Sequence, residues 1–92
     1  MIKTFKNKDT QEVYEGKKNK KWLAIQKQLE KRLQILDEAT SLRDLRCLPS
    51  NRFEALHGDR ANQYSIRINL QWRICFKWIN NEPHEVEIVD YH

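Results

Sequence analysis

The chain has 92 residues, and its 17 Lys and Arg outnumber its 13 Asp and Glu, which gives a formal net charge of +4 at pH 7. A chain of this length is expected to form one domain over residues 1–92, with a core too small to enclose a large substrate. A chemical site should therefore be a shallow groove that a polymer covers, and the positive charge favours nucleic acid as that polymer.

The opening segment, residues 1–6, alternates apolar and polar side chains and predicts a half-buried strand. A short helix is expected around residues 9–15. The loop that begins at Gly16 carries a basic run, Lys17, Lys18, Lys20 and Lys21. Positive charge is unfavourable at the start of the helix that follows, so helix stability does not explain the run. It is either a solvated loop or a patch that contacts RNA phosphates.

The next segment has helical periodicity. Its apolar residues are spaced three and four apart, which predicts one helix of about five turns. They are Trp22, Ile25, Leu29, Leu33 and Leu36. Asn19 is expected to cap this helix, and residues 41–49 predict a short irregular turn after it.

The second half of the chain has the pattern of strands. Alternating segments occur at residues 51–57, 64–68, 72–78 and 85–89. Turns are expected between them at residues 58–59 and 80–83. Early helices and late hairpins predict an α+β fold, in which N-terminal helices pack on one side of a small, mainly antiparallel sheet.

Cys47 and Cys75 lie far apart, form no Cys-x-x-Cys pair and are expected to be buried free thiols. No apolar run approaches the roughly 20 residues that span a bilayer, and the start of the chain does not resemble a signal peptide. We therefore expect a cytoplasmic protein that does not associate with membranes. Three residues, Trp22, Trp72 and Trp78, are expected in the core.

The sheet face that the helices leave uncovered is expected to meet solvent or a partner. Side-chain alternation places basic and aromatic residues there, namely Arg67, Arg73, Lys77 and Tyr91. Cleavage of RNA requires a group that takes the proton of a 2′-hydroxyl, a group that protonates the departing 5′-oxygen, and a cation beside the transition state. Histidine suits the proton transfers and arginine suits phosphate, so His57, His92 and Arg73 are the candidates.

This chemistry does not require a metal, and we expect neither a metal nor an organic cofactor. A metal site built from His57, His84 and His92 is not supported, because no short spacing or shared helix brings these residues together. His84 follows Pro83 at a hairpin and is expected at the surface.

The C-terminal half resembles a known family, the HigB killer toxins of the RelE/ParE superfamily. The resemblance is carried by motifs at residues 49–56, 58–60, 63–69, 71–76 and 86–92. The opening residues 2–5 and the length of the chain are also similar. The resemblance implies a compact RelE-like fold and a toxin that cuts messenger RNA on the ribosome, as an endoribonuclease that uses no metal.

The same resemblance implies which residues form the site. An Asp-Tyr-His tail and a sheet arginine correspond here to Asp90, Tyr91, His92 and Arg73. Relatives usually have lysine at the position of His57, and the best-studied type has histidine at the position of Glu54. Either His57 supplies an imidazole from a shifted position, or the proton transfers depend on His92. Arg73 would stabilise charge on phosphate, Tyr91 would stack on a base or orient the nucleotide, and Asp90 would fix an imidazole.

The family also implies a partner, an antitoxin of the HigA type with a helix-turn-helix domain. The pair would repress its own promoter, so that promoter DNA is bound only through the complex. Two alternatives stay open. One is a ParE-like inhibitor of DNA gyrase without chemistry of its own, against which the Asp-Tyr-His tail argues, and the other is an inactive domain that only binds nucleic acid or its partner.

Overall fold

The structure is a computed structural model, and it describes residues 1–90. Its helical elements are α1 (Lys8–Tyr14), the 3-10 turn η1 (Lys20–Ile25), α2 (Gln26–Glu38), α3 (Leu42–Arg46) and the 3-10 turns η2 (Pro49–Asn51) and η3 (Gly58–Arg60). Its strands are β1 (Glu54–Ala55), β2 (Tyr64–Arg67), β3 (Trp72–Ile79) and β4 (Glu82–Asp90). The predicted α+β class is confirmed.

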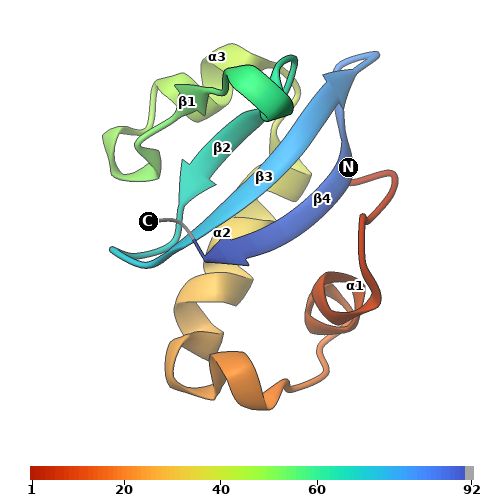
Figure 1. Cartoon of the computed structure of the whole chain (residues 1–92), viewed down its shortest axis with the longest axis vertical. Helices are drawn as coiled ribbons and strands as arrows, with labels where there is room; N and C mark the ends of the chain where they lie inside the picture. Colours follow the sequence, from red (N-terminus) through yellow and green to blue (C-terminus); the bar gives the residue numbers. More distant parts are fainter. Residues whose placement is uncertain (91–92) are drawn as a thin grey trace.

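The strands form an antiparallel sheet in the order β1-β2-β3-β4, with α2 behind it in Figure 1. The register pairs Ile66 with Ile74 and Ile74 with Ile88, so even-numbered side chains share one face. They join Leu29 and Leu36 of α2 in the core, where these five residues are at most 6% exposed. Burial of each such side chain contributes about 1.5–3 kcal/mol, which holds the helix layer against the sheet.

The N-terminal segment does not form the strand that the sequence predicts over residues 1–6. It follows the outer edge of β4, where an isolated parallel bridge joins Phe5 to Val86 and the Val86 amide donates to the carbonyl of Thr4 at 3.1 Å. A bulge interrupts β4 at this point, because Glu85 adopts a left-handed φ of 49°. Separate hydrogen bonds, and not a regular strand, therefore join the N-terminal segment to this edge of β4.

Helix α1, which the sequence predicts around residues 9–15, continues this cover of the β4 edge. The Ile88 amide donates to the hydroxyl of Thr10, which is fully buried, at 3.1 Å. The Ile2 amide donates to a carboxylate oxygen of Asp37 in α2 at 2.8 Å. The N-terminal segment and α1 are therefore tied to both the sheet and α2.

The helix predicted from Trp22 onward is broken into η1 and α2. Asn19 caps η1, as predicted, through a side-chain oxygen that accepts a backbone amide at 2.9 Å. Trp22 and Ile25 have φ angles of −122° and −119°, so the regular helix begins only at Gln26. The Trp22 indole is 2% exposed and meets Trp72 edge-on, with ring centroids 5.9 Å apart. Such a pair contributes about 0.5–1.5 kcal/mol, and the break directs the indole into it.

Residues 41–49 include a short helix, α3, where the sequence predicts an irregular turn. Ser41 caps it by accepting the Asp44 amide at 3.3 Å, while the Asp44 carboxylate accepts the amide and hydroxyl of Thr40 at 3.0 and 3.1 Å. These hydrogen bonds from Thr40 hold the pKa of Asp44 below its ordinary value. The Ser-x-x-acid spacing is a capping signal that apolar periodicity does not detect.

The predicted strands of the second half are confirmed, with different ends. Only two residues of the segment 51–57 are in β1: Asn51 ends η2, and residues 52–53 and 56–57 belong to no helix or strand. The last hairpin turns at Asn80 and Asn81, which both have positive φ, so β4 begins at residue 82 and includes His84. His84 is half-buried opposite Lys77 and is not a fully exposed turn residue.

The cysteines differ in burial. Cys75 is fully buried on β3, as predicted, whereas Cys47 is exposed and its predicted burial is wrong. Cys47 is the C-cap that follows the short helix α3, in which Leu45 is the buried residue. The tryptophans follow the prediction: Trp22 is buried, and Trp72 and Trp78 are partly buried against the core.

Candidate active site

Arg73 lies on the sheet face opposite α2, as side-chain alternation predicts. The prediction that this face is open is wrong at Arg73, which is 5% exposed, and at its neighbours Ser65 and Cys75, which are fully buried. The segment from η2 to η3 covers this part of the sheet through contacts to Arg73 and to Glu87 of β4. Arg73 is therefore a buried cation that lies between the sheet and the segment from η2 to η3.

The Arg73 guanidinium is held in place by groups from neighbouring strands and turns. Its Nε donates to the Ser65 hydroxyl at 2.8 Å, and its Nη2 donates to the backbone carbonyl of Arg52. Its Nη1 lies 3.8 Å from Oε1 of Glu54, whose side chain is 47% exposed. A donor group that is fixed in advance stabilises developing charge without having to reorganise.

A buried network shapes the turn that holds Arg73. Asn51 is fully buried, accepts a hydrogen bond from Nη1 of Arg32 at 2.6 Å and donates to the Leu45 carbonyl at 3.0 Å. The next residue, Arg52, adopts left-handed angles of φ 46° and ψ 50°, which residues with a Cβ rarely do. Its carbonyl then accepts Nη2 of Arg73. The network links α2, through the turn, to β3.

Replacing Asn51 with alanine is expected to lower the free energy of unfolding by about 1–3 kcal/mol, because the buried Leu45 carbonyl and the half-buried Arg32 guanidinium lose a partner. Denaturant unfolding measures this loss. The matched control is Ser50→Ala, at the exposed neighbouring position. Equal unfolding free energies in the two variants would show that Asn51 does not hold the turn.

Glu54 is a candidate that the sequence did not single out as catalytic. Its half-exposed carboxylate lies beside Arg73, and a carboxylate in that place can accept a proton. A signal was present in the sequence: the resemblance marks this position as one that carries a titratable side chain in the best-studied relatives. Ser65, also missed, has the appearance of an ordinary polar strand residue, and its role is visible only in the hydrogen bond to Arg73.

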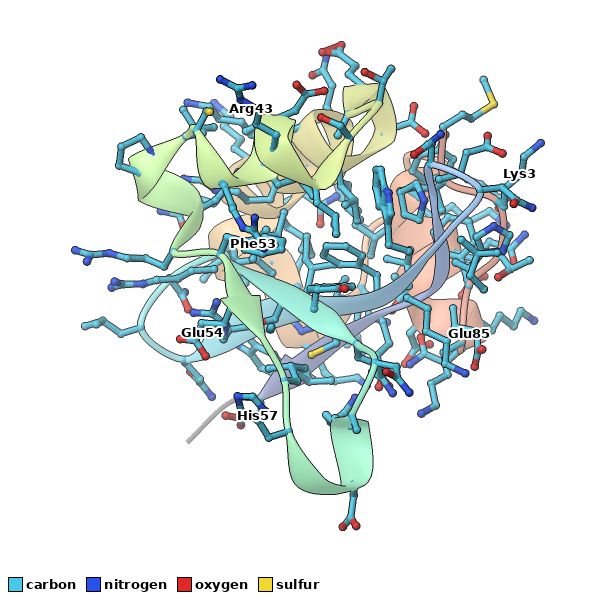
Figure 2. The ribbon with its side chains drawn as sticks, turned by 90° about the horizontal axis from the view of Figure 1, so that it is seen from above. Lys3, Arg43, Phe53, Glu54, His57 and Glu85 are labelled. Atoms are coloured by element: carbon cyan, nitrogen blue, oxygen red, sulfur yellow. The ribbon has the colours of Figure 1, made fainter. Side chains whose placement is uncertain are left out.

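His57 is exposed and precedes η3. Figure 2 shows His57 and Glu54 on the same side of the molecule, with Lys3 on the other. A cavity of about 300 Å³ has five lining residues, Glu54, Ala55, Leu56, His57 and Arg60. His57 and Glu54 thus line the same cavity, and Glu54 also contacts the Arg73 guanidinium.

The C-terminal tail begins close to Arg73. Asp90 ends β4 and pairs with Trp72, the residue before Arg73, and its carboxylate accepts a hydrogen bond from the side-chain Nε2 of Gln71 at 3.1 Å. Tyr91 and His92 lie outside the described residues. The roles predicted for them stay predictions.

The two other basic residues predicted on the face of Arg73 are engaged within the protein. Arg67 pairs directly across the sheet with Arg73 and donates to the Asn69 carbonyl at 3.2 Å. Lys77 forms an ion pair with Glu85 at 2.8 Å, which lowers the pKa of Glu85. Both side chains remain partly exposed beside the buried arginine.

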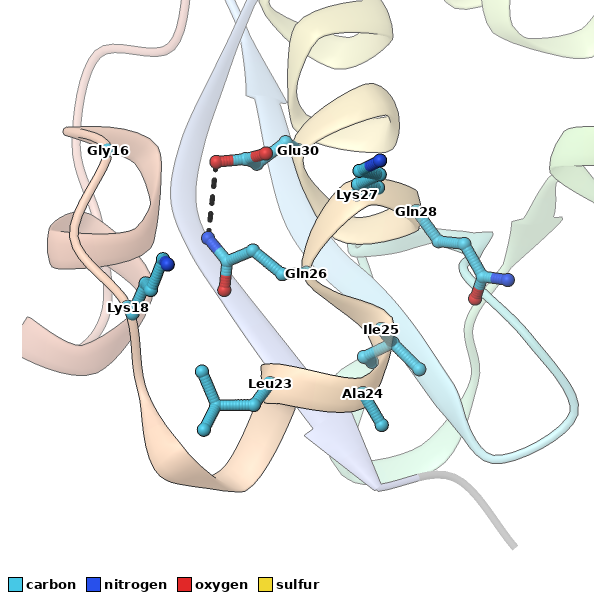
Figure 3. Close-up of a pocket in the computed structure, with 9 residues that line it drawn as sticks. All are labelled: Gly16, Lys18, Leu23, Ala24, Ile25, Gln26, Lys27, Gln28 and Glu30. Carbon is cyan, nitrogen blue, oxygen red and sulfur yellow. Dashed lines mark hydrogen bonds between the residues drawn. The ribbon is translucent and has the colours of Figure 1, made fainter.

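The basic run of Lys17, Lys18, Lys20 and Lys21 lies on the helix side of the sheet. Lys17 and Lys21 pair with acidic residues of α1 at 3.7 and 2.9 Å, and Lys21 lies over the ring of Trp22, which packs against the core. Lys18 lines a cavity of about 570 Å³ between the loop and the start of α2 (Figure 3). The structure does not bring these lysines to the face that carries Arg73.

Within residues 1–90, no group of three or more His, Cys, Asp and Glu side chains is arranged to hold a metal ion. Across the same residues, the helices are too short or too polar to cross a bilayer.

Sequence comparison identifies the family. A family model described as the RelE-like toxin of the type II toxin-antitoxin system HigB matches residues 3–92. The chain belongs to this toxin family. Among HigB relatives, Toxin HigB-1 of Vibrio cholerae is 39% identical over 94 residues, covering 92% of this chain and 99% of that protein. Endoribonuclease HigB of Proteus vulgaris is 32% identical over 93 residues, covering 100% of both.

Solved structures have the same fold as this HigB-like chain. A YoeB-YefM complex from Staphylococcus aureus contains a chain with a TM-score of 0.62 and 20% identity, covering 100% of this chain and 98% of that one. A YoeB/ParE toxin from Agrobacterium tumefaciens has a TM-score of 0.51 and 20% identity, covering 98% of both chains. The RelE/ParE-like fold predicted for the HigB-like chain is confirmed.

Proposed function

We propose that this HigB-like toxin acts, as a single domain of residues 1–92, as an endoribonuclease that cuts messenger RNA in the decoding site of the ribosome. The observation that most supports it is the buried Arg73 guanidinium beside the half-exposed Glu54 carboxylate. A fixed cation next to a proton acceptor suits attack of a 2′-hydroxyl on phosphate. The similarity to Endoribonuclease HigB of Proteus vulgaris supports the same activity.

The proposed reaction is a transesterification that needs no metal. The 2′-oxygen loses its proton and bonds to the adjacent phosphorus, while the bond between phosphorus and the 5′-oxygen breaks and that oxygen takes up a proton. The products are a 2′,3′-cyclic phosphate and a 5′-hydroxyl. Arg73 stabilises the negative charge on the phosphoryl oxygens, a contribution of about 10²–10³ in rate for a well-placed donor.

The proton transfers are assigned to Glu54 or His57 and to His92. Glu54 is the proposed acceptor of the 2′-hydroxyl proton, with His57 at the same cavity as the alternative acceptor. His92 is the proposed donor to the 5′-oxygen. Asp90 would fix the His92 imidazole, and Tyr91 would stack on a base. Residues proposed to contact RNA phosphates farther from the cut are Arg67, Lys77, Lys17, Lys18, Lys20 and Lys21.

The proposed partner is a HigA-like antitoxin with a helix-turn-helix domain, which binds the promoter DNA of the pair through the complex. The family description, a toxin of a type II toxin-antitoxin system, supports an antitoxin partner. The proposed site of action is the cytoplasm, where the messenger is translated. One test of the pairing is whether an open reading frame beside the toxin encodes a helix-turn-helix protein.

Inducing the toxin in a bacterial host and mapping the 5′ ends of messengers tests the proposed activity. We expect growth arrest with new ends inside translated reading frames. The control is the same messenger with its start codon removed, which should stay intact at equal abundance because no ribosome carries it. DNA breaks linked to gyrase, with messengers intact, would instead identify a ParE-like toxin. Unchanged growth with promoter repression by the complex would identify an inactive binding domain.

A further inference from the structure

Arg60, the last residue of the Gly-Asp-Arg motif in η3, has no part in the mechanism above. Its Nη1 donates to Oε1 of Glu87 at 2.7 Å and to Oε1 of Gln63 at 3.3 Å. The Glu87 side chain is 12% exposed, and its hydrogen bond raises the pKa of Arg60. The guanidinium is therefore fixed in orientation through one nitrogen, while 38% of the Arg60 side chain stays exposed.

Arg60 is anchored one row away from Arg73 on the same face of the sheet. Glu87 pairs with Cys75, which follows Arg73 by two positions in β3, so the rows lie about 6.7 Å apart along the strands. Burial raises the pKa of the Cys75 thiol, which therefore stays neutral near the two guanidinium groups. A positively charged groove is typical of proteins that follow the backbone of single-stranded nucleic acid.

The cavity beside Arg60 has the chemistry that a nucleobase requires. It measures about 300 Å³, and its lining residues include His57, Arg60 and the half-buried Leu56. Bases of single-stranded RNA stack on histidine rings and on arginine planes, and their edges hydrogen-bond to side chains. Because Glu54 lines this cavity and also contacts Arg73, a base bound here belongs to a nucleotide next to the scissile bond.

We propose that Arg60 binds the phosphate next to the scissile one, and that the cavity it forms with Leu56 and His57 receives the base of that nucleotide. This subsite rests on the proposed ribonuclease function. It makes Arg60 a substrate-binding residue and the cavity a determinant of which base flanks the cut. Arg60 should then act on KM, whereas Arg73 acts on kcat.

Cleavage kinetics with messenger bound to ribosomes test the proposal. Loss of a hydrogen bond to a charged group weakens binding by about 10- to 100-fold, so Arg60→Gln should raise KM by that factor with kcat little changed. Arg60→Lys keeps the charge without the planar fork, so its KM should lie between that of the unchanged protein and that of Arg60→Gln. His57→Ala should change the base preference at one position beside the cut, measured by sequencing the 5′ ends.

Controls separate substrate binding from a purely structural ion pair. Glu87→Gln removes the anchoring charge but keeps the Arg60 guanidinium, so its KM should rise less than that of Arg60→Gln. Lys3→Gln removes a lysine from the exposed ion pair with Glu82, on the other side of the molecule in Figure 2, and should leave KM unchanged. If Arg60→Gln and Glu87→Gln lower the melting temperature alike and neither raises KM, the ion pair is structural and the proposal is overturned.

Salt-dependent binding keeps this test independent of catalysis. The probe is a single-stranded 2′-O-methyl RNA oligonucleotide, which has no 2′-hydroxyl for the reaction. Removing one phosphate contact should reduce the slope of log affinity against log salt by about 0.7, so Arg60→Gln should show that reduction. If Arg60→Gln reduces the slope but the unchanged protein does not cut messenger, the subsite is supported and the ribonuclease function is rejected. If the unchanged protein cuts messenger but Arg60→Gln changes neither KM nor the slope, the ribonuclease function is supported and the subsite is rejected.

Discussion

Arg73→Lys is expected to abolish growth arrest and to slow messenger cleavage by about 10²–10³-fold. Lysine keeps the positive charge but has no planar fork, so it cannot donate at once to Ser65, to the Arg52 carbonyl and to a phosphoryl oxygen. The loss should appear in kcat more than in KM, because Arg73 acts on charge that develops in the transition state. Single-turnover cleavage of ribosome-bound messenger measures it.

Stability must be measured on the same variant, since the Ser65 hydroxyl and the Arg52 carbonyl lose a buried partner, at a cost of about 1–3 kcal/mol. The matched control is Arg43→Lys, which makes the same exchange on the exposed surface of α3. It should retain both the melting temperature and the cleavage rate. A folded Arg73→Lys protein that cuts messenger as fast as this control would remove the guanidinium from the mechanism.

His92→Gln is expected to reduce cleavage by about 10²–10⁴-fold, the usual contribution of a general acid or base. Glutamine can still form hydrogen bonds but cannot exchange a proton near neutral pH. Free histidine titrates with a pKa of about 6.5, so one limb of the pH profile of kcat should disappear with the imidazole. Glu54→Gln removes the proposed proton acceptor and should lower kcat as well.

The matched control for this exchange is His84→Gln, which replaces a half-buried histidine of β4 that has no place in the mechanism. It should keep the rate and both limbs of the profile. Growth arrest and messenger cleavage that persist in His92→Gln would show that the last residue does not transfer a proton, which would overturn its assignment as the donor.

The features predicted correctly from the sequence are those with a local signal. Alternation over residues 64–68 and 72–78 identifies β2 and β3, and the parity of position 73 places its side chain on the correct face. Its burial has no local signal, because it depends on the Arg52 carbonyl and on Glu54, which the chain brings over the sheet from another segment. The pattern of apolar residues around position 73 therefore cannot predict that Arg73 is buried.

The errors arise where a distant contact overrides a local pattern. The helix predicted from Trp22 is broken where the indole meets Trp72, a residue of the sheet. The first six residues alternate like a strand, yet they meet β4 at the bulge of Glu85, where no regular ladder can form. The role of Ser65 was missed for the same reason, since its hydroxyl meets the Arg73 guanidinium only across two neighbouring strands.

The sealed edge of β4 restricts how another protein can extend the sheet. Residues 3–10 already hydrogen-bond to that edge, so an incoming strand would have to displace the beginning of the chain. The opposite edge ends in β1, which is two residues long and includes Glu54. A protein that added a strand there would lie beside Glu54 and next to the cavity that this residue lines.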